Sequence, residues 1–511
     1  MKHFLLLLWL ICIAAAANAA PQAARKPNIL IILADDMGYS DIRCYGGEVE
    51  TPNLDNLARN GLRFTQFYNT ARCWPSRAAL LTGYYAQQVR RDALPGVSPS
   101  GVRGVRPEWA RMLPDLLKSQ GYRSYHSGKW HLDGLPLENG FDHSYYVEDT
   151  DRYFGPQKHF EDDKPLPIPA KDSGYYATTV MADHAIKYLK EHHERYRDKP
   201  FFQYLAFTSP HFPLQALPQD IAKYRERFAG GWDCLRQERL QRMTALGIVN
   251  TELSARASEV PAWDSLGAVE KKEWQQRMAV HAAMIDRMDR EIGRVLAQLK
   301  STGDIDNTVV FFLSDNGASA EKLVRGDGND SAASPGSAAS FLCLEPGWAN
   351  LANAPLRYTK MFVHEGGIST PLIVHWPKGI RAQGELRHTP GHLIDIAPTI
   401  LSLVGMPVPE KANGTARPPI PGRSLVPSLT RNEPISRDDL WWFHEGNRAI
   451  RVGDWKLVSA GADAPWELYN LRTDRSERHD LASKYPATVR NLAQKWGKQL
   501  EEFQALAQPK P

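Results

Sequence analysis

The sequence predicts an α/β protein with a mostly parallel sheet between helices, followed by a smaller α+β subdomain. Three apolar runs without alternation, at residues 27–34, 201–207 and 308–313, are typical of strands buried on both faces. Amphipathic segments of helical period lie between these runs, as in proteins whose parallel strands are joined by helices. At 511 residues the chain exceeds what one compact core usually supports, which indicates a second domain.

The first 19 residues are predicted to be a cleaved signal peptide. Lys2 and His3 precede an apolar run over residues 4–17, and Ala17-Asn18-Ala19 is typical of a cleavage site. The run is shorter than the roughly 20 apolar residues that a membrane span needs, so an N-terminal anchor is the weaker alternative. We therefore expect a periplasmic or secreted protein without a stable membrane anchor.

Charge and cysteine content narrow the possible partners and cross-links. The net charge is +4, and no block of lysines and arginines resembles a nucleic-acid footprint, so no nucleic-acid partner is expected. Four cysteines follow the signal peptide: Cys44, Cys73, Cys234 and Cys343. They allow three full pairings, among which the sequence does not choose, and modification of Cys73 would leave at most one disulfide.

The N-terminal third places two chemically interesting segments at the ends of elements. The first strand, at residues 27–34, runs into Asp35-Asp36, at the sheet edge where open α/β proteins bind ligands. Pro75 suits the first turn of a helix, so Cys73 is expected at or just before a helix N-terminus, where backbone N–H groups favour anions. The other elements expected here are a helix at 52–59, a strand at 64–68, a helix at 75–81, a helix at 107–121 and a strand at 122–126.

The middle of the chain repeats the pattern of helix and buried strand. The strand at 201–207 leads to His211, and the strand at 308–313 runs into Asp315-Asn316. A polar insert at 219–275 is predicted to be helical and peripheral, and residues 318–358 form a long loop of the kind that is usually functional. The elements expected around them are helices at 174–196 and 278–300, a strand at 371–375 and a helix at 394–404.

A Pro- and Gly-rich stretch divides the chain. We predict a larger domain over residues 27–405, a linker at 406–422 and a C-terminal subdomain over 423–511. The subdomain is expected to contain antiparallel strands at 450–458 and 466–471 and a closing helix near 487–503.

Four oxygen-bearing side chains follow two core strands far apart in sequence and predict a metal site. They are Asp35, Asp36, Asp315 and Asn316. Oxygen donors in this number suit Ca²⁺ or Mg²⁺, and the absence of a His/Cys cluster argues against zinc. Each pair can also be an ordinary turn, but the placement of both at strand ends favours metal. A free thiol at Cys73 would not suit such a site, because hard cations select oxygen over sulfur.

Five cationic groups follow strands or glycine turns and suit an anionic ester. They are Arg77, Lys129, His131, His211 and Lys360. Such groups can hold a tetrahedral oxyanion and protonate a leaving oxygen. Each also has a plain structural interpretation, as a helix cap, a solvated lysine or a turn histidine; their shared placement favours the catalytic one.

Several ordered motifs resemble the type I, arylsulfatase-like sulfatases. They are Leu33–Gly38, Cys73–Gly83 with its Cys-Trp-Pro-Ser-Arg start, Gly128–His131, Pro210-His211, Ser314–Gly317, Lys360 with Glu365–Gly367, and Arg451–Leu457. The resemblance implies an alkaline-phosphatase-like fold and hydrolysis of sulfate monoesters of aryl compounds or carbohydrates. It also implies a bound Ca²⁺ (Mg²⁺ is possible) and conversion of Cys73 to formylglycine by a formylglycine-generating maturation enzyme, with the aldehyde hydrate as the nucleophile.

The resemblance also implies a role for each candidate. Metal ligands would be Asp35, Asp36, Asp315, Asn316 and the converted Cys73. Arg77 and His131 would steady the aldehyde hydrate, Lys129 and Lys360 would contact sulfate, and His211 with Lys360 would serve the leaving group. The sequence departs from the family pattern at Arg43, Tyr84 and Asp133.

Two alternatives stay open. The first is a phosphonate monoester hydrolase or phosphodiesterase of the same superfamily, and the second is a non-catalytic binder of sulfated glycans in which Cys73 is unmodified. The substrate is not identifiable from sequence. We expect its pocket to be shaped by the loop at 318–358, the insert at 219–275 and the segment 444–447.

Overall fold

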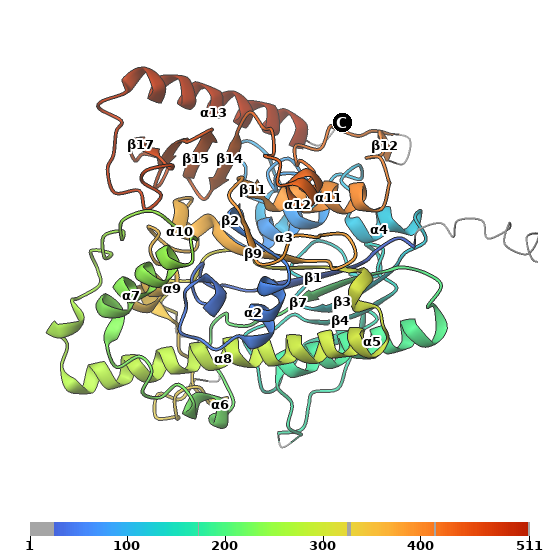
Figure 1. Cartoon of the computed structure of the whole chain (residues 1–511), viewed down its shortest axis with the longest axis horizontal. Coiled ribbons are helices and arrows are strands. Elements are labelled where there is room, and N and C mark those ends of the chain that lie inside the picture. The colour runs from blue at the N-terminus through green and yellow to red at the C-terminus, as the bar shows by residue number, and fades with distance from the viewer. Residues whose placement is uncertain (1–24, 172, 324–328, 413–414, 509–511) are drawn as a thin grey trace, which may run out of the picture.

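The computed structural model describes residues 25–171, 173–323, 329–412 and 415–508, so the predicted signal peptide at 1–19 lies outside the described residues. Within these ranges, no helix has the length and apolar character to cross a bilayer. The chain forms a large mixed sheet covered by helices and a small antiparallel sheet covered by one helix (Figure 1). The predicted fold class, a mostly parallel sheet between helices with a smaller C-terminal subdomain, is confirmed.

Four parallel strands form the centre of the large sheet. They are β8 (Thr308–Ser314), β1 (Asn28–Ala34), β7 (Phe201–Ala206) and β3 (Arg123–Gly128), adjacent in this order. Ala34 pairs with Ser314, and Ala206 pairs with Gly128, so the strands end level with one another. Because all four run in one direction, the residues that follow them emerge at one edge of the sheet.

The outer strands make the sheet mixed. On one side, β9 (Ser369–His375) is antiparallel to β8, and β2 (Leu62–Tyr68) is antiparallel to β9. The short strands β10 (Glu385–Arg387) and β11 (Gly391–His392) both pair with β2. On the other side, β4 (His143–Val147) continues the parallel order, and β5 (His159–Glu161) and β6 (Lys164–Pro165) follow antiparallel.

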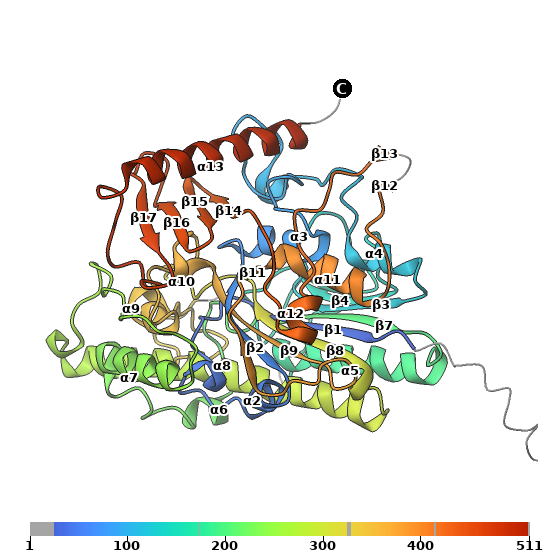
Figure 2. The same ribbon diagram turned by 45° about the horizontal axis from the view of Figure 1, so that its top comes forward.

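Helices cover both faces, which is why the central strands read as unbroken apolar runs. One face carries α2 (Pro52–Arg59), α5 (Ala177–Arg195) and α8 (Ala268–Ser301). The other carries α3 (Cys73–Thr82), α4 (Leu113–Lys118), α11 (Ile396–Leu403) and α12 (Val426–Arg431) (Figures 1 and 2). The shorter helices α6 (Pro218–Ala222), α9 (Glu345–Ala352) and α10 (Glu365–Ile368) lie in connections. Alternate residues of β1 therefore belong to two separate apolar cores.

Four predictions that concern helices need correction. The helix expected at 107–121 spans only Leu113–Lys118, because Met112 is extended and Pro114 sits in the first turn. The helix expected at 278–300 begins ten residues earlier, at Ala268, and the loop expected at 318–358 contains α9. Helix α7 (Gly231–Ala245), within the insert at 219–275, is not peripheral: Trp232 is buried, and Arg239 is buried against Asp41 and Glu48.

The C-terminal sheet has four antiparallel strands, β14 (Leu440–His444), β15 (Asn447–Val452), β16 (Trp455–Ser459) and β17 (Glu467–Asn470). The segment 450–458, predicted as one strand, is divided between β15 and β16 by a turn in which Gly453 has a φ of 59°. Helix α13 (Pro486–Ala507) packs over this sheet (Figure 2). The predicted linker contains the two-residue strands β12 (Lys411–Ala412) and β13 (Thr415–Ala416); the domain boundaries themselves stay predictions.

Candidate active site

The carboxyl ends of the four central strands bring the predicted residues together. Asp35 and Asp36 follow β1, Asp315 and Asn316 follow β8, and Lys129 follows β3. His211 lies five residues beyond β7, and the loop between α9 and α10 contributes Lys360. All of these side chains are buried. The site therefore lies where the topology of a parallel sheet puts it, at the edge reached by all four strands.

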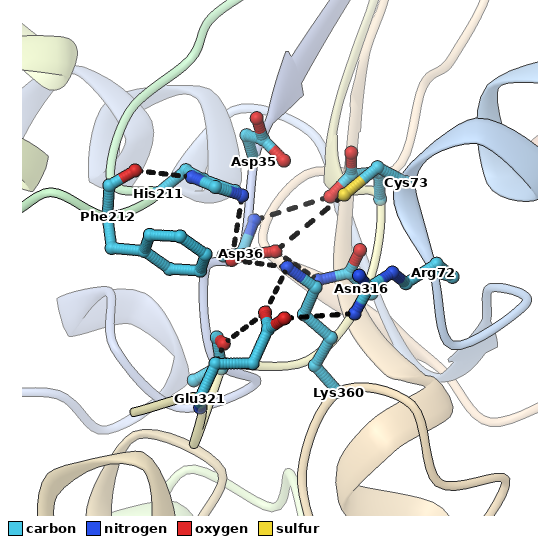
Figure 3. Close-up of polar contacts among 12 residues, drawn as sticks. Asp35, Asp36, Arg72, Cys73, His211, Phe212, Asn316, Glu321 and Lys360 are labelled. Atoms are coloured by element: carbon cyan, nitrogen blue, oxygen red, sulfur yellow. Dashed lines mark hydrogen bonds and ion pairs between the residues drawn. The ribbon is translucent and has the colours of Figure 1, made fainter. Parts of the chain in front are cut away.

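Cys73 is the first residue of α3, as its Pro75-containing sequence predicts. Arg72 before it is extended, and Gly83, with a φ of 79°, ends the helix. The Cys73 thiol is buried, and its Sγ lies 4.0 Å from Oδ1 of Asp36 (Figure 3). Burial raises the pKa of the Cys73 thiol to about 12, so an unmodified thiol at this position would be a poor nucleophile at neutral pH.

Asp36 lies at the centre of the polar contacts drawn in Figure 3. Its Oδ2 accepts a hydrogen bond from Lys360 Nζ at 2.9 Å and lies 3.6 Å from Nε2 of His211. Its Oδ1 accepts from Nδ2 of Asn316 at 2.6 Å. The Asp36 carboxylate thus contacts side chains from three distant parts of the chain.

Asp35 and Asp315 form a second set of contacts with the cations. Lys129 Nζ donates to Oδ2 of Asp35 at 2.6 Å. Arg77 donates from Nε and Nη2 to Oδ2 of Asp315, at 3.1 and 2.8 Å, and from Nη1 to the carbonyl of Lys129. Both side chains of the Arg77–Asp315 pair are fully buried, so the loss of one partner would leave an uncompensated charge.

Burial and mutual charge set the ionisation of these groups. Burial opposes ionisation of Asp35, but the charges of Lys129 and Arg77 outweigh it and hold the pKa of Asp35 well below its usual range. Burial, together with the charge of Asp35, raises the pKa of Asp315 to about 7. Burial also lowers the pKa of His131 and of His211, so both imidazoles favour the neutral form.

The arrangement fits a hard cation. Ligand atoms of Asp35, Asp36, Cys73 and His211 all lie within 4.8 Å of one another. Oδ1 of Asp35 and Oδ1 of Asn316 are buried without a hydrogen-bond partner, and such orphaned oxygens require an explanation. A bound Ca²⁺ or Mg²⁺ would satisfy both oxygens. The carboxylate of Asp315, the remaining predicted ligand, accepts hydrogen bonds from Arg77 and from the backbone N–H of Asp36; its part in holding the metal stays a prediction.

Several segments of the site contain residues with a strained backbone. Asp36 and His131 have φ values of 63° and 54°, and Tyr358 and Met361, which flank Lys360, have 66° and 79°. Non-glycine residues in this region cost of order 1 kcal/mol or more, and they persist where the surroundings require a particular geometry. The strain marks the segments that present Asp36, His131 and Lys360.

One residue of the site was missed by the sequence analysis. Glu321, seven residues after β8, contacts Lys360 Nζ at 2.9 Å and Arg72 Nη1 at 3.4 Å (Figure 3). Burial raises its pKa, but Lys360 and Arg72 outweigh this and lower the pKa of Glu321 to about 2. Glu321 belongs to no recognisable sequence motif. Its position in the long loop after Asp315-Asn316 is the one feature of the sequence that could have indicated a role in the site.

Two departures from the family pattern have structural partners away from the reacting groups. The hydroxyl of Tyr84 donates to the carbonyl of Pro418 at 2.5 Å, and Asp133 accepts from Nε of Arg106 at 2.8 Å. Arg43 is exposed in a short 3-10 turn. None of the three displaces a predicted catalytic group.

Comparison with known proteins decides the family. A sequence model of the sulfatase family matches residues 27–406, and a model of the C-terminal region of N-sulphoglucosamine sulphohydrolase matches residues 356–505. The chain belongs to the sulfatase family. Its relatives in this family are sulfatases, so the protein is a sulfatase. The predicted resemblance to arylsulfatase-like enzymes is confirmed.

Relatives of this sulfatase extend over most of its length. An uncharacterized sulfatase of Schizosaccharomyces pombe is 33% identical over 93% of each chain. The arylsulfatase of Klebsiella aerogenes is 32% identical over 77% of this chain and 89% of its own. The N-acetylgalactosamine-6-sulfatase of Rattus norvegicus is 28% identical over 90% of this chain and 75% of its own.

Solved structures share the architecture of the sulfatase. Ps i-CgsB in complex with k-i-k-neocarrahexaose superposes with a TM-score of 0.68 and 25% identity over 93% of each chain. The phosphonate monoester hydrolase SpPMH of Silicibacter pomeroyi has a TM-score of 0.56 and 21% identity, covering 93% of this chain and 95% of its own. At that identity the second likeness concerns the fold alone.

Proposed function

We propose that this sulfatase hydrolyses sulfate monoesters through a formylglycine at position 73 and a bound divalent cation, Ca²⁺ or Mg²⁺. The observation that carries the proposal is the meeting of Cys73 with Asp35, Asp36 and Asn316 inside a ring of buried cations. A buried thiol of raised pKa has no evident use there, whereas an oxygen-bearing side chain would suit both the cation and the reaction.

Two groups that the site would hold supply the chemistry. Asp35, Asp36 and Asn316 would bind the cation, which when bound polarises oxygen ligands and offsets negative charge. Formylglycine, formed from Cys73 by a maturation enzyme, supplies an aldehyde whose hydrate is a nucleophile. Asp315 is adjacent, and we assign it to orienting Arg77 as well as to the metal side of the site.

The protein's own side chains then have defined tasks. Lys129 and Lys360 bind the sulfate oxygens, since each ammonium is buried and fixed by one aspartate. Arg77 holds Asp315 and the carbonyl of Lys129 in place. His211, whose lowered pKa favours the neutral form, and Lys360 lie next to each other around Asp36 and serve the leaving oxygen.

The remaining assignments follow from the sequence. The predicted signal peptide supports export to the periplasm or beyond, and the substrate is a sulfated small molecule or glycan. A phosphonate monoester hydrolase is the second candidate, favoured only by the likeness of fold to SpPMH. A glycan binder with an intact Cys73 thiol is the third.

Mass spectrometry and paired assays test this function. In the native host, the peptide containing residue 73 should be lighter than the cysteine form by about 18 Da, the loss expected on conversion of cysteine to formylglycine. Purified protein should then hydrolyse 4-nitrophenyl sulfate or a sulfated glycan with a higher kcat/KM than a phosphonate monoester. A higher kcat/KM on the phosphorus ester would overturn the assignment, and an unmodified thiol throughout the native preparation would favour the binder.

Metal removal is expected to lower both activity and thermal stability. The carboxylates of Asp35 and Asp36 lie close together, and Oδ1 of Asp35 and Oδ1 of Asn316 are buried without a hydrogen-bond partner. A ligand at 100 times its Kd stabilises the folded state by about 2.7 kcal/mol. Protein treated with a chelator should therefore show a lower Tm that Ca²⁺ restores; comparison with Mg²⁺ identifies the preferred ion. A Tm that responds to neither treatment would contradict the metal site.

A further inference from the structure

A cavity next to Lys360 adjoins the proposed sulfate site. Its volume is about 490 Å³, and Glu321 and Lys360 form part of its wall. Residues 255–259 of the insert supply much of the remainder, together with four residues of the long loop, Pro346, Asn350, Arg357 and Tyr358. These are two of the three segments from which the sequence predicted a substrate pocket. Because Lys360 is proposed to serve the leaving oxygen, the group attached to that oxygen must lie on the Lys360 side of the site.

Glu321 is an unusual neighbour for a site that binds an anion. Its carboxylate is ion-paired with Lys360 and Arg72, accepts a hydrogen bond from Ser319 Oγ at 2.9 Å, and keeps 20% of its side-chain surface exposed. Figure 3 shows this carboxylate between Lys360 and Arg72, on the far side of Lys360 from Cys73. A partly buried negative charge here disfavours any anionic group of the substrate other than the sulfate itself. The presence of Glu321 therefore indicates something about the kind of substrate that binds.

Lys360 is the cation of the cavity wall that pairs with Glu321, and it is shared with Asp36. The other wall cations are engaged elsewhere, Arg256 with Asp233 at 2.8 Å and Arg357 with Glu467. Each positive charge is thus matched by a carboxylate. The wall also offers a free hydrogen-bond acceptor: Oδ1 of Asn350 is buried and has no hydrogen-bond partner. The wall suits a ligand that brings hydrogen-bond donors and no negative charge of its own.

We propose that this cavity binds the alcohol part of the sulfate ester and that Glu321 selects an alcohol rich in hydroxyl or amino donors without a second anionic group. The substrate class is then a monosulfated neutral sugar or amino sugar. Uronic acids and sugars with a neighbouring second sulfate are rejected by charge repulsion. This inference rests on the proposed sulfatase activity and adds a specificity-determining residue to it.

The test compares two esters that differ by one charge. The probes are 4-carboxyphenyl sulfate and its methyl ester, with N-acetylglucosamine 6-sulfate and glucosamine 2-N,6-O-disulfate as a carbohydrate pair. Repulsion between partly buried charges several ångströms apart predicts about a tenfold preference of the wild-type enzyme for the less charged member. Glu321→Gln, which keeps the shape and removes the charge, should reduce that preference severalfold. Glu433→Gln, at an exposed carboxylate of a surface ion pair, should leave it unchanged.

The outcomes separate the inference from the activity. Equal loss on both members of a pair in Glu321→Gln would mean that Glu321 only positions Lys360, and would overturn the proposed selectivity. Wild-type kcat/KM values that do not favour the less charged member would overturn it as well. Failure of the wild-type, formylglycine-containing enzyme on every sulfate ester would remove the proposed function itself. Preference for the less charged ester, reduced by Glu321→Gln alone, supports the inference.

Discussion

Cys73→Ala is expected to reduce kcat for a sulfate ester by about 10⁴-fold or more, because it removes the residue from which the nucleophile is formed. The fold should persist. Cys73 contributes a small side chain at the start of α3, and its Sγ makes only a long, 4.0 Å contact with Asp36. Turnover of a sulfate ester and the Tm of the same preparation, measured together, separate loss of chemistry from loss of structure.

Cys343→Ala is a matched control for this substitution. Cys343 is also a buried free thiol, with its Sγ near the carbonyl of Leu323, and it is not among the proposed catalytic or metal-binding residues. It should change kcat by no more than a few fold. Substantial turnover by Cys73→Ala would exclude residue 73 as the source of the nucleophile, and equal inactivation by both substitutions would point to a general effect of cavities.

Glu365→Gln is expected to destabilise the protein by about 3–5 kcal/mol, the cost typical of breaking a buried ion pair by removing one partner. Glu365 is fully buried at the start of α10. It contacts Lys456 Nζ of β16 at 3.0 Å and Arg475 Nε at 3.2 Å, and it accepts a hydrogen bond from Tyr68 of β2 at 3.0 Å. The substitution leaves two cations of the C-terminal subdomain without this carboxylate. Unfolding in denaturant at pH 7 measures the loss.

The loss of stability in Glu365→Gln is expected to depend on pH. Burial raises the pKa of Glu365, but Lys456 and Arg475 outweigh burial and lower this pKa from its ordinary value of 4.5 to about 2. A lowered pKa means that the carboxylate stabilises the folded state fully above pH 4.5 and loses this contribution as the pH falls towards 2. The difference in unfolding free energy between wild type and Glu365→Gln should therefore shrink below pH 4.5. Glu433→Gln, at an exposed ion pair, should leave the stability almost unchanged at every pH. A constant difference across this range would show that Glu365 acts through packing and not through charge.

Local pattern was sufficient for the central sheet and for most of the site. An apolar run that ends in Asp35-Asp36, and another that ends in Asp315-Asn316, imply neighbouring strand ends once the strands are recognised as parallel. Pro75 and Gly83 likewise bound α3 and fix where Cys73 lies. These inferences succeed because strand burial and helix ends depend on residues close together in sequence.

The elements that the pattern misjudged depend on contacts made across the fold. Arg239 is a charged residue in a polar helix, and nothing near it in the sequence reveals that Asp41 and Glu48 neutralise it in the interior. The turn at Gly453 divides a segment whose apolar residues read as one strand. The burial of Arg239 depends on carboxylates elsewhere in the chain, and the division of the segment 450–458 depends on how the strands pair.

From the amino-acid pattern alone, the chain is recognisable as an α/β protein that resembles sulfatases, with carboxylates, cations and a cysteine at the ends of its strands. Which of these groups contact one another is known only from the folded chain, in which Asp315 pairs with Arg77 and Glu321 pairs with Lys360. Such ion pairs join side chains that are far apart in sequence or lie on irregular loops, and no periodic pattern of residues encodes the distance between them.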